Sequence, residues 1–295
     1  MDFSFVIVNY NTTALTLACV QSIYTFTKKN AFEVIIVDNA SCDTTIGDIA
    51  TQYPELIYIE NKENLGFGRA NNQGVKLSRG KYVFLLNSDA LLTSDAGNAF
   101  FTFMEANENR QVACCGAALI DRNGKDQISY GNFPTFAEAF SALGFLRLYH
   151  RYHHQHLSSG VFNYSDEIRP VDYVCGADLF IRSTVITVLG GFDPDFFLYF
   201  EEVDLAARMK QAGYRSVIIP DVKIIHHEGA SLGGSGLNHL KMAHYAASRR
   251  KYFEKRHGRF AAMCINKIYA LQAIIFSVVK LEPQYLRSAR ILFNA

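Results

Sequence analysis

Short, strongly apolar runs alternate with longer mixed segments over the first hundred residues, and this order limits the possible folds more than any other feature. The apolar runs lie at residues 5–8, 34–38, 56–60 and 82–87, and each is followed by polar residues. Segments of helical character fill the gaps, at 13–29, 43–52 and 68–78. The pattern predicts an α/β fold with a mostly parallel central sheet flanked by helices on both faces.

Residues 125–170 are less regular and predict a long excursion over the surface. Strand patterns resume at 171–181 and 214–220, around a helix expected at 201–212. From residue 239 the chain is helical and basic, and it is strongly apolar at 260–281. We therefore expect one α/β domain over residues 1–238 and a helical C-terminal extension over residues 239–295.

Composition and charge exclude several classes of protein. Of the 295 residues, 49% are hydrophobic, which is enough for a sizeable core and rules out a disordered or collagen-like chain. Residues 240–295 hold 11 Lys and Arg against 2 Asp and Glu, a net charge of +9, whereas the other 18 basic and 26 acidic residues give −8. A basic tail on an acidic body suggests an anionic partner.

The cysteines and the N-terminus point to a cytoplasmic protein. The six cysteines show no CxxC spacing, and a chain of this size does not need disulfides, so we expect reduced thiols. The start, MDFSFVIVNYN, lacks a basic region and has only a short apolar run, which favours a first buried strand over a signal peptide.

Polar residues follow three of the apolar runs, as Asn9-Tyr10-Asn11, Asp38-Asn39 and Asn87-Ser88-Asp89. In parallel sheets ligands bind at the carboxyl ends of the strands, so these residues are candidates for a site. A carboxylate there can contact a ribose or hold a divalent cation against a diphosphate. The same residue types also cap the helices that follow, and the pattern alone leaves both interpretations open.

The segment NLGFGRANNQG (64–74) contains Gly66 and Gly68, but Asn71 stands where a dinucleotide-binding GxGxxG motif has its third glycine. A glycine-flanked loop entering a helix can still offer backbone N–H groups to a phosphate, and Arg69 a charge. A tight turn with a glycine cap is the structural alternative.

Three carboxylates, Glu201, Glu202 and Asp204, crowd at the start of the helix expected at 201–212, behind an aromatic run. They complement the helix dipole, and neighbouring carboxylates beside aromatic rings also raise one another's pKa values, as a general base requires.

Farther on, HHEGAS (226–231) follows a strand, and an imidazole there could complete a cation site begun by Asp89.

Together these stretches resemble the family 2 inverting glycosyltransferases with a GT-A fold, in particular the rhamnosyltransferase-like bacterial branch. The resemblance covers residues 3–231 and rests on VIVNYN, IIVDNAS, NLGFGRANNQG, FLLNSDA, the block from GGFD to FEEVDLAARMKQAGY, and HHEGAS, in the family's order and spacing. It implies a GT-A (Rossmann-like) sheet and transfer of a sugar with inversion of its anomeric configuration.

The resemblance also implies roles for individual residues. The nucleotide-sugar site would be formed by Asn9, Tyr10, Asp38, Asn39, Asn64, Gly66, Arg69, Asn72, Ser88 and Asp89. Asn87-Ser88-Asp89 takes the place of the DxD motif with Asn first, so Asp89 is the metal-binding carboxylate for Mn²⁺ or Mg²⁺. His226 would be the further metal ligand, with His227 as the alternative.

On the acceptor side, Glu202 takes the position of the catalytic base, while Glu201 and Asp204 would bind the acceptor or position the helix. Asp178, in VCGADLFIR, would contact the acceptor. The expected donor is dTDP-rhamnose and the acceptor a lipid-linked bacterial surface glycan, with UDP-hexoses or UDP-N-acetylhexosamines as alternative donors. A nucleotidyltransferase and a non-catalytic sugar-nucleotide-binding subunit are the other classes, and the first would release pyrophosphate in place of a nucleoside diphosphate.

The tail suggests a peripheral membrane helix. Asn266, Lys267 and Gln272 interrupt the apolar run at 260–281, which favours a helix in the headgroup region over a true span. The preceding basic residues, from Arg249 to Arg259, would face anionic lipid at the inner face of the cell membrane. Packing on the body or in a homodimer interface is the alternative. Nucleic acid is not an expected partner, because no recognised binding module accompanies the basic residues.

Overall fold

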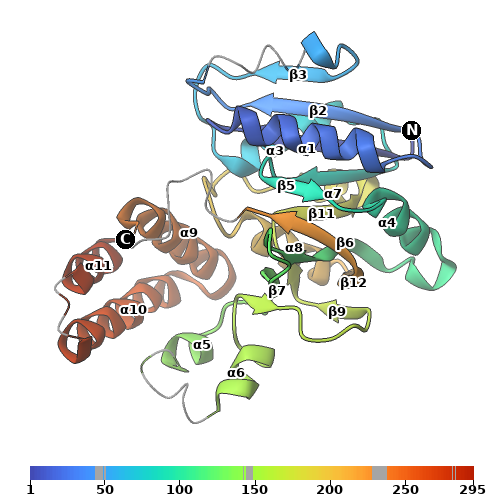
Figure 1. Ribbon diagram of the computed structural model, residues 1–295. Helices are drawn as coiled ribbons and strands as arrows, with labels where there is room; N and C mark the ends of the chain where they lie inside the picture. Colours follow the sequence, from blue (N-terminus) through green and yellow to red (C-terminus); the bar gives the residue numbers. More distant parts are fainter. Residues whose placement is uncertain are drawn as a thin grey trace.

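The computed structural model describes residues 1–43, 49, 51–141, 143, 149–227, 238–280, 282 and 284–295. Its main sheet has the strand order β3-β2-β1-β4-β11-β6-β12-β5, with β9 paired to β12 (Figure 1). These strands are β1 Phe3–Asn9, β2 Phe32–Asp38, β3 Ile57–Glu60, β4 Tyr82–Leu86, β5 Ala90–Leu92, β6 Val112–Ile120, β9 Arg169–Val171, β11 Asp178–Arg182 and β12 Arg215–His226. A smaller sheet joins β10 (Tyr173–Val174), β7 (Ile128–Gly131) and β8 (Val161–Phe162).

Helices cover both faces of the main sheet and continue beyond it. They are α1 Thr13–Phe26, α3 Phe67–Leu77, α4 Ala96–Glu105, α5 Phe136–Ser141, α6 His150–His156, α7 Ser183–Val188, α8 Glu201–Gln211, α9 His239–His257, α10 Arg259–Lys280 and α11 Gln284–Asn294, with a 3-10 turn, η1, at Asn107–Asn109. The helices predicted at 13–29, 68–78 and 201–212 are confirmed, whereas most of the helix predicted at 43–52 lies outside the described residues.

The sheet is mostly parallel, as predicted, because β1, β2, β3, β4, β6 and β12 run in one direction and only β5, β9 and β11 run in the other. Strands β3, β2, β1 and β4 are parallel neighbours, as are β6 and β12, but β11 runs antiparallel between β4 and β6. Its first residue, Asp178, pairs with Leu86 at the end of β4. This direction follows from the preceding chain, since β11 enters the sheet from the edge where β4 ends. The single strand pattern at 171–181 is accordingly broken into the end of β9, then β10 and β11, which belong to two sheets.

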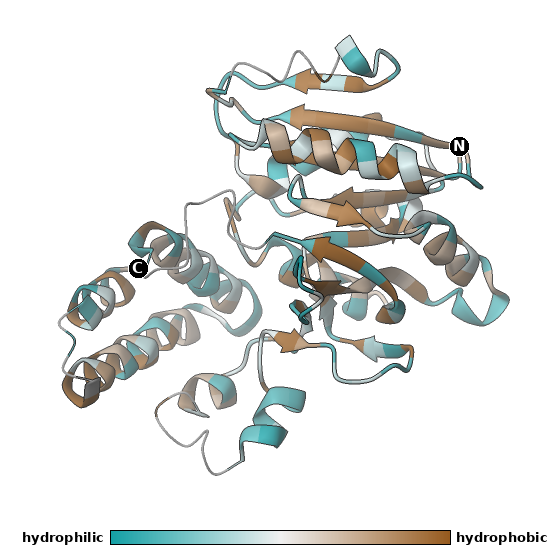
Figure 2. Ribbon diagram, in the orientation of Figure 1, coloured by the Kyte–Doolittle hydropathy of each residue, from teal (hydrophilic) through white to brown (hydrophobic). Residues whose placement is uncertain are grey.

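Alternate residues of the inner strands face two separate hydrophobic layers, as the two-residue period of a strand requires. In β1, Phe3, Phe5 and Ile7 pack with α1 and α4 on one face, whereas Val6 packs with α3, α7 and α8 on the other. Both faces are covered, so the strands are apolar throughout, and Figure 2 shows them brown along most of their length. This three-layer core fixes the ends of β1, β2 and β4 relative to one another.

The predicted helical extension is present as α9, α10 and α11 (Figure 1). Helix α9 ends at His257, and the next residue, Gly258, has a φ of +85°, a backbone conformation that favours glycine. Ring contact between Phe253 of α9 and Phe136 of α5, with 5.2 Å between centroids, joins the extension to the excursion at 125–170.

Candidate active site

The ends of β1 and β2 are joined by side-chain hydrogen bonds. The parallel register places Asn9 beside Asp38, and the Asn9 Nδ2 donates to Asp38 Oδ1 at 2.8 Å. Ser41 closes the turn after β2, because its backbone N–H and its hydroxyl both donate to the Asp38 carboxylate, at 3.1 and 2.6 Å. Asp38 is therefore held in one orientation at the carboxyl edge of the sheet, with Tyr10 half-buried beside it.

The turn after β4 is bonded to the same cluster. Asn9 Oδ1 accepts hydrogen bonds from the hydroxyls of Thr12 and Thr16 at the start of α1. The Thr12 hydroxyl in turn lies 2.9 Å from that of Ser88. The predicted residues Asn9, Asp38 and Ser88 therefore belong to one network, which links three strand ends that are far apart in sequence.

The 61–66 loop is attached to the end of β2 by amide side chains. Asn39 Nδ2 donates to Asn64 Oδ1 at 2.8 Å, and Asn39 Oδ1 accepts from the Leu65 backbone N–H at 3.0 Å. Gly66 follows with a φ of +84°, and a Cβ there would lie 2.3 Å from the Phe197 carbonyl oxygen. Glycine is therefore required at this position by both the backbone conformation and the close approach.

Two residues of α3 connect this loop to the segment before α8. Asn72 exchanges two hydrogen bonds with the backbone of Phe192, both at 2.8 Å. Arg69 Nε donates to the Pro194 carbonyl at 2.8 Å. Arg69 and Asn72 therefore bind protein backbone in this structure. Their contribution to the predicted nucleotide-sugar site is to hold α3 and the segment before α8 together.

Asp89 and His226 lie together at the end of the sheet. Strand pairing sets His226 opposite Ala90, and its Nε2 is 3.3 Å from Asp89 Oδ1. The ring of His227 is engaged elsewhere, since Arg122 Nε donates to its Nε2 at 2.9 Å. Burial and the positive charge of Arg122 lower the pKa of His227. The geometry therefore favours His226 of the two histidines.

A carboxylate and an imidazole are suitable ligands for Mn²⁺, and Mg²⁺ binds through one or two carboxylates plus substrate phosphates. No group of three or more potential metal-ligating side chains occurs among the described residues. The donor set at Asp89 and His226 therefore fits a cation that shares its ligands with a bound diphosphate, and does not form a cage of its own.

Glu202 is the second residue of helix α8 and lies close to this edge of the sheet. A Cβ on Gly176 would lie 3.8 Å from the Glu202 carboxyl carbon, and the next residue, Ala177, accepts a hydrogen bond from the Asn87 backbone N–H at 2.9 Å. The Gly176-Ala177 turn therefore lies between Glu202 and the turn after β4, which carries Asp89. The predicted base thus lies on the side of the sheet where β4 ends, next to the turn that precedes β11.

The backbone that presents Glu202 is in an unfavourable conformation. Tyr199 and Phe200 have φ values of 70° and 69°, in the left-handed region that bulky residues rarely adopt. Each costs on the order of 1–3 kcal/mol and persists only where the surroundings impose it. The ring of Phe200 is held against Tyr245 and Tyr252 of α9, with centroid distances of 5.0 and 5.6 Å.

Burial gives the two glutamates different acidities. Burial raises the pKa of Glu202 to about 7 and outweighs the opposing effect of backbone hydrogen bonds at the start of α8. Burial, with the charge of Glu202, raises the pKa of Glu201 well above its usual range. Glu201 packs beside Gly68 of α3, and its Oε2 is buried with no hydrogen-bond partner among the described residues. The pKa of Glu202 therefore lies near neutral pH, where this side chain can gain or lose a proton.

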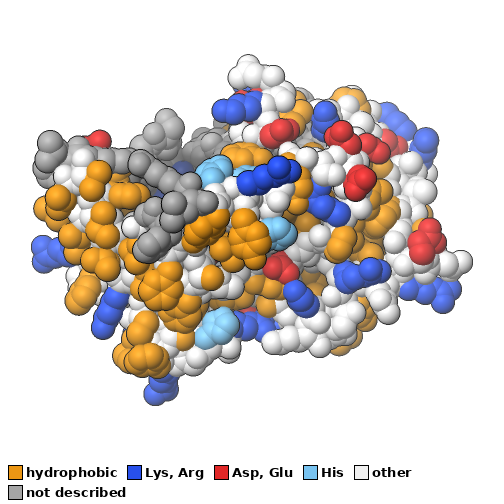
Figure 3. All heavy atoms as spheres, turned by 90° about the horizontal axis from the view of Figure 1, so that it is seen from below, with side chains coloured by type: hydrophobic (Ala, Val, Ile, Leu, Met, Phe, Trp, Pro, Cys, Tyr) orange, Lys and Arg blue, Asp and Glu red, His pale blue; other side chains and the backbone are white. Residues whose placement is uncertain are grey.

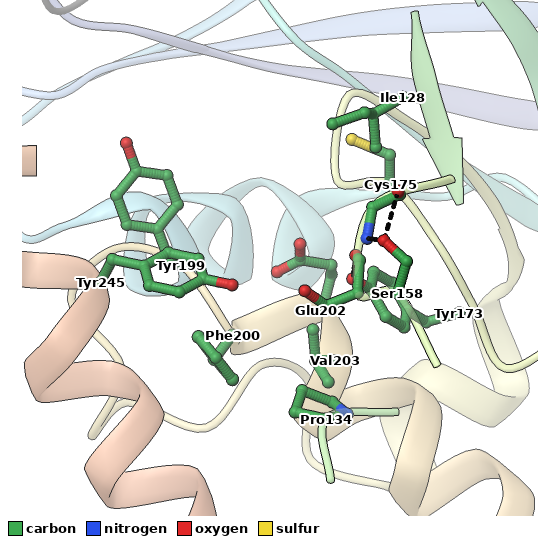
Figure 4. Close-up of a pocket in the computed structure, with 12 residues that line it drawn as sticks. Ile128, Pro134, Ser158, Tyr173, Cys175, Tyr199, Phe200, Glu202, Val203 and Tyr245 are labelled. Carbon is green, nitrogen blue, oxygen red and sulfur yellow. Dashed lines mark hydrogen bonds between the residues drawn. The ribbon is translucent and has the colours of Figure 1, made fainter. Parts of the chain in front are cut away.

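Glu202 lines a cavity of about 440 Å³ with a largely aromatic wall. Figure 4 shows its side chain between Tyr199 and Tyr245 on one side and Ser158, Tyr173 and Cys175 on the other. The cavity is built from the excursion at 125–170, the β10–β11 turn, α8 and α9. Its volume is ample for a sugar ring, since typical ligand pockets measure about 300–1,000 Å³.

The other three predicted acceptor-side carboxylates, Glu201, Asp204 and Asp178, do not line this cavity. Asp204 is buried and forms ion pairs with Arg208 at 2.7 Å and with Arg256 at 2.9 Å, which suits the helix-positioning role. Asp178 is 0% exposed within β11, and its Oδ2 accepts from the Ala117 backbone N–H. Burial raises its pKa well above the usual range. A side chain with no exposed surface is not placed to contact an acceptor.

Sequence reasoning missed several residues of the site. Tyr245 and Tyr173 line the cavity but carry no local motif, because the elements that bear them meet only in the fold. Ser41 could have been found, since Asp-x-x-Ser is a spacing at which an aspartate commonly closes a turn by accepting hydrogen bonds.

The sequence is similar to those of known glycosyltransferases. The sequence profile of Glycosyl transferase family 2 matches residues 4–166. The N-acetylglucosaminyl-diphospho-decaprenol L-rhamnosyltransferase of Mycobacterium tuberculosis is 25% identical over 228 residues, covering 72% of this chain and 71% of the relative. Rhamnosyltransferase WbbL of Escherichia coli K12 is 25% identical over 238 residues, covering 76% and 85%.

A solved structure of similar shape is the mannosyltransferase PcManGT from Pyrobaculum calidifontis in complex with GDP-Man and Mn²⁺. It superposes with a TM-score of 0.58 at 16% identity, over 99% of this chain and 86% of that one. The predicted GT-A type of α/β fold is thereby confirmed.

Proposed function

The chain belongs to glycosyl transferase family 2 and is a glycosyltransferase, and from this premise we propose that it transfers a sugar from a nucleotide-activated donor to a glycan hydroxyl with inversion at the anomeric carbon. The observation that carries the proposal is the short path from Glu202 through the Gly176-Ala177 turn to Asn87. It sets a base in the acceptor cavity beside the edge at which a nucleotide diphosphate would bind.

Each half of the site has a separate task in this proposal. The Asn9–Asp38 pair and the bonded loop from Asn64 to Gly66 bind the nucleotide, because buried, fully oriented polar groups recognise bases and ribose with little loss of freedom. Arg69 and Asn72 hold the loop against the segment before α8. Both substrates are thereby held in line for reaction.

Asp89 and His226 would hold a divalent cation together with the diphosphate, and the cation would supply stabilisation of the charge that develops on the leaving group. Mn²⁺ is present in the mannosyltransferase of similar fold, which supports a divalent cation here. The chain's own contribution is orientation: His226 is placed by the pairing of β12 with β5, and Asp89 by the turn after β4.

Glu202 acts as the general base. It accepts the proton of the acceptor hydroxyl as that oxygen attacks the anomeric carbon from the side opposite the nucleoside diphosphate. The carbon–oxygen bond to the diphosphate breaks with its electron pair, and the new glycosidic bond has the inverted configuration.

The names of the two relatives support dTDP-rhamnose as the donor and a lipid-linked glycan as the acceptor. UDP-hexoses and UDP-N-acetylhexosamines are the alternative donors. The part of the chain that the structure describes holds all six cysteines and shows no disulfide between them, and Cys114 and Cys115 are buried neighbours, which supports action in the reducing cytoplasm.

Product analysis tests the function. Purified protein is incubated with each nucleotide sugar, Mn²⁺ and an N-acetylglucosaminyl diphospholipid, and the products are identified by mass and by NMR of the new anomeric centre. Release of a free nucleoside diphosphate with an inverted linkage is the expected result. Release of pyrophosphate from a nucleoside triphosphate and a sugar phosphate would indicate a nucleotidyltransferase, and binding without any turnover would indicate a non-catalytic subunit.

A further inference from the structure

Three of the basic residues that the sequence predicts against lipid, Arg249, Lys255 and Arg256, are engaged within the protein. Arg249 is 4% exposed, and its guanidinium lies over the Tyr269 ring at 3.6 Å. Lys255 forms ion pairs with Asp193 and Asp195, and Arg256 with Asp204. Lys255 and Arg256 therefore hold α9 against the α/β domain, and Arg249 holds it against α10.

The apolar surface of the extension lies instead on α10. Its outward residues Phe260, Met263, Leu271, Ile274 and Val278 are each 44–76% exposed. These residues are spaced by three, four or eight positions, so they lie on one face of the helix. Lys267, which is also exposed, lies on the same face between Met263 and Leu271. Isolated exposed apolar residues are ordinary on a protein surface, but a stripe along a helix of 22 residues marks an interaction site.

The opposite face of α10 packs against the rest of the protein. Ala261, Ala262 and Ile265 belong to the core beneath the sheet, and Asn266 accepts a hydrogen bond from Arg249 at 2.8 Å. By length and composition α10 could cross a membrane, with a mean hydropathy of 1.7 in an 18-residue window of Arg259–Val279. A helix that keeps one face on the domain through a buried polar pair cannot be surrounded by lipid, so α10 suits a position along a surface.

Helix α11 extends the apolar stripe and adds positive charge. Leu286, Arg290 and Phe293 lie on one exposed face of α11, and Lys267 Nζ of α10 is 5.8 Å from the centre of the Phe293 ring. Residues 259–295 contain five Lys and Arg and one acidic residue. Neither Lys267 nor Arg290 forms an ion pair with a described residue. Figure 3 shows hydrophobic side chains gathered at the end of the molecule that α10 and α11 occupy in Figure 1, with Lys and Arg at its margin.

We propose that the outward face of α10 and α11, the α10–α11 face, binds the surface of an anionic lipid bilayer, with its apolar side chains at the level of the headgroups and Lys267, Arg287 and Arg290 against lipid phosphate. Apolar side chains interleaved with lysine and arginine are the pattern of helices that lie in a membrane interface. The α9 wall of the acceptor cavity is packed directly against α10, so the bound enzyme holds this cavity at the membrane. Binding to lipid does not depend on the proposed sugar transfer, and it is measured without donor or acceptor.

The test is co-sedimentation of the full chain with vesicles of phosphatidylcholine alone or with 30% phosphatidylglycerol, an amount on the order of that in acidic membranes. We compare the wild type with a Phe260→Gln, Leu271→Gln, Ile274→Gln variant. The residues are exposed, so the fold is retained, and circular dichroism verifies this. Val188→Gln and Leu77→Gln are matched controls, because these residues are 85% and 46% exposed on the α/β domain.

We expect the triple variant to bind anionic vesicles at least tenfold more weakly than the wild type, and both controls to bind as the wild type does. Each of Lys267→Gln, Arg287→Gln and Arg290→Gln should bind about fivefold more weakly. Equal binding of the triple variant and the wild type would overturn the proposal. So would equal affinity for neutral and anionic vesicles. A wild-type dimer in solution that the triple variant converts to a monomer, without vesicle binding by either, would assign the face to a second copy of the chain.

Discussion

Asp204 on α8 and Arg256 on α9 form a buried ion pair, with 2.9 Å between the carboxylate Oδ1 and the guanidinium Nη2. Asp204 lies two residues beyond Glu202, so the pair connects the helix that carries the proposed base to the C-terminal extension. Arg256 also donates to the Asp204 backbone carbonyl, at 3.1 Å. The extension therefore stabilises the first turn of α8 as well as completing the acceptor cavity through Tyr245.

Removal of the Asp204–Arg256 ion pair should lower the free energy of unfolding. Arg256→Ala leaves Asp204 with one remaining partner, Arg208, and we expect the free energy of unfolding to fall by about 1–3 kcal/mol. Arg259→Ala is the matched control, because Arg259 is 92% exposed and surface ion pairs contribute about 0–1 kcal/mol. Urea titration followed by circular dichroism measures both. Equal stability of the two variants would show that the extension is not coupled to α8.

The proposed base predicts a dependence of activity on pH. Glu202 accepts a proton only when it is ionised, and burial raises its pKa to about 7. We therefore expect kcat/KM to rise about tenfold per pH unit at acidic pH and to level off above about 7. In a Glu202→Asp variant, which shortens the side chain, the bend in the profile should move. A profile of unchanged slope from pH 5 to 8, in a protein that remains folded, would exclude Glu202 as the titrating group.

The position of the histidine rings predicts which of them supports cation binding. His226 Nε2 faces Asp89, whereas the His227 ring accepts a hydrogen bond from Arg122. His226→Ala should raise the Mn²⁺ concentration needed for thermal stabilisation by a nucleotide sugar by at least about tenfold. His227→Ala should leave it within a factor of about two. The reverse order would assign the role to His227.

Tyr245 predicts a contribution of the extension to acceptor binding. Its ring forms part of the cavity wall on the side opposite Tyr173. Tyr245→Ala should raise the KM for the acceptor by about 5- to 10-fold, since aromatic stacking contributes roughly 0.5–1.5 kcal/mol beyond area burial. The KM for the donor should stay constant.

Tyr245→Phe, which keeps the ring, should restore most of the acceptor affinity. Tyr152→Ala is a control on an exposed tyrosine of α6. An equal rise in both KM values would indicate a general disturbance of the fold, and no rise in either would place the acceptor elsewhere.

Local sequence was sufficient for the N-terminal half of the fold. The apolar runs that became β1, β2, β3 and β4 are each short and bounded by polar residues, and the residues that follow them do meet at one edge of the sheet. The motif at residues 201–204 also began a helix as predicted. In these segments propensity, hydrophobic pattern and tertiary position agree.

The remainder depends on contacts between distant segments. The pattern at 171–181 reads as one strand, but only the fold reveals that Asp172 and residues 175–177 are turns between sheets. Asp178 resembles an accessible site residue in sequence, yet the pairing of β11 with β4 and β6 buries it completely. The charges of α9 likewise gave no indication that their partners would be Asp193, Asp195 and Asp204, roughly 50–60 residues away.

The rate of sugar transfer by Glu202→Gln tests the central claim most directly. Glutamine keeps the shape of the side chain but cannot accept the acceptor proton, so we expect kcat to fall by about 10²–10⁴-fold, with nucleotide-sugar binding unchanged by calorimetry. Glu254→Gln, at an exposed position on α9, should keep full activity. Transfer at the wild-type rate by Glu202→Gln would contradict the assignment of Glu202 as the base and with it the proposed mechanism.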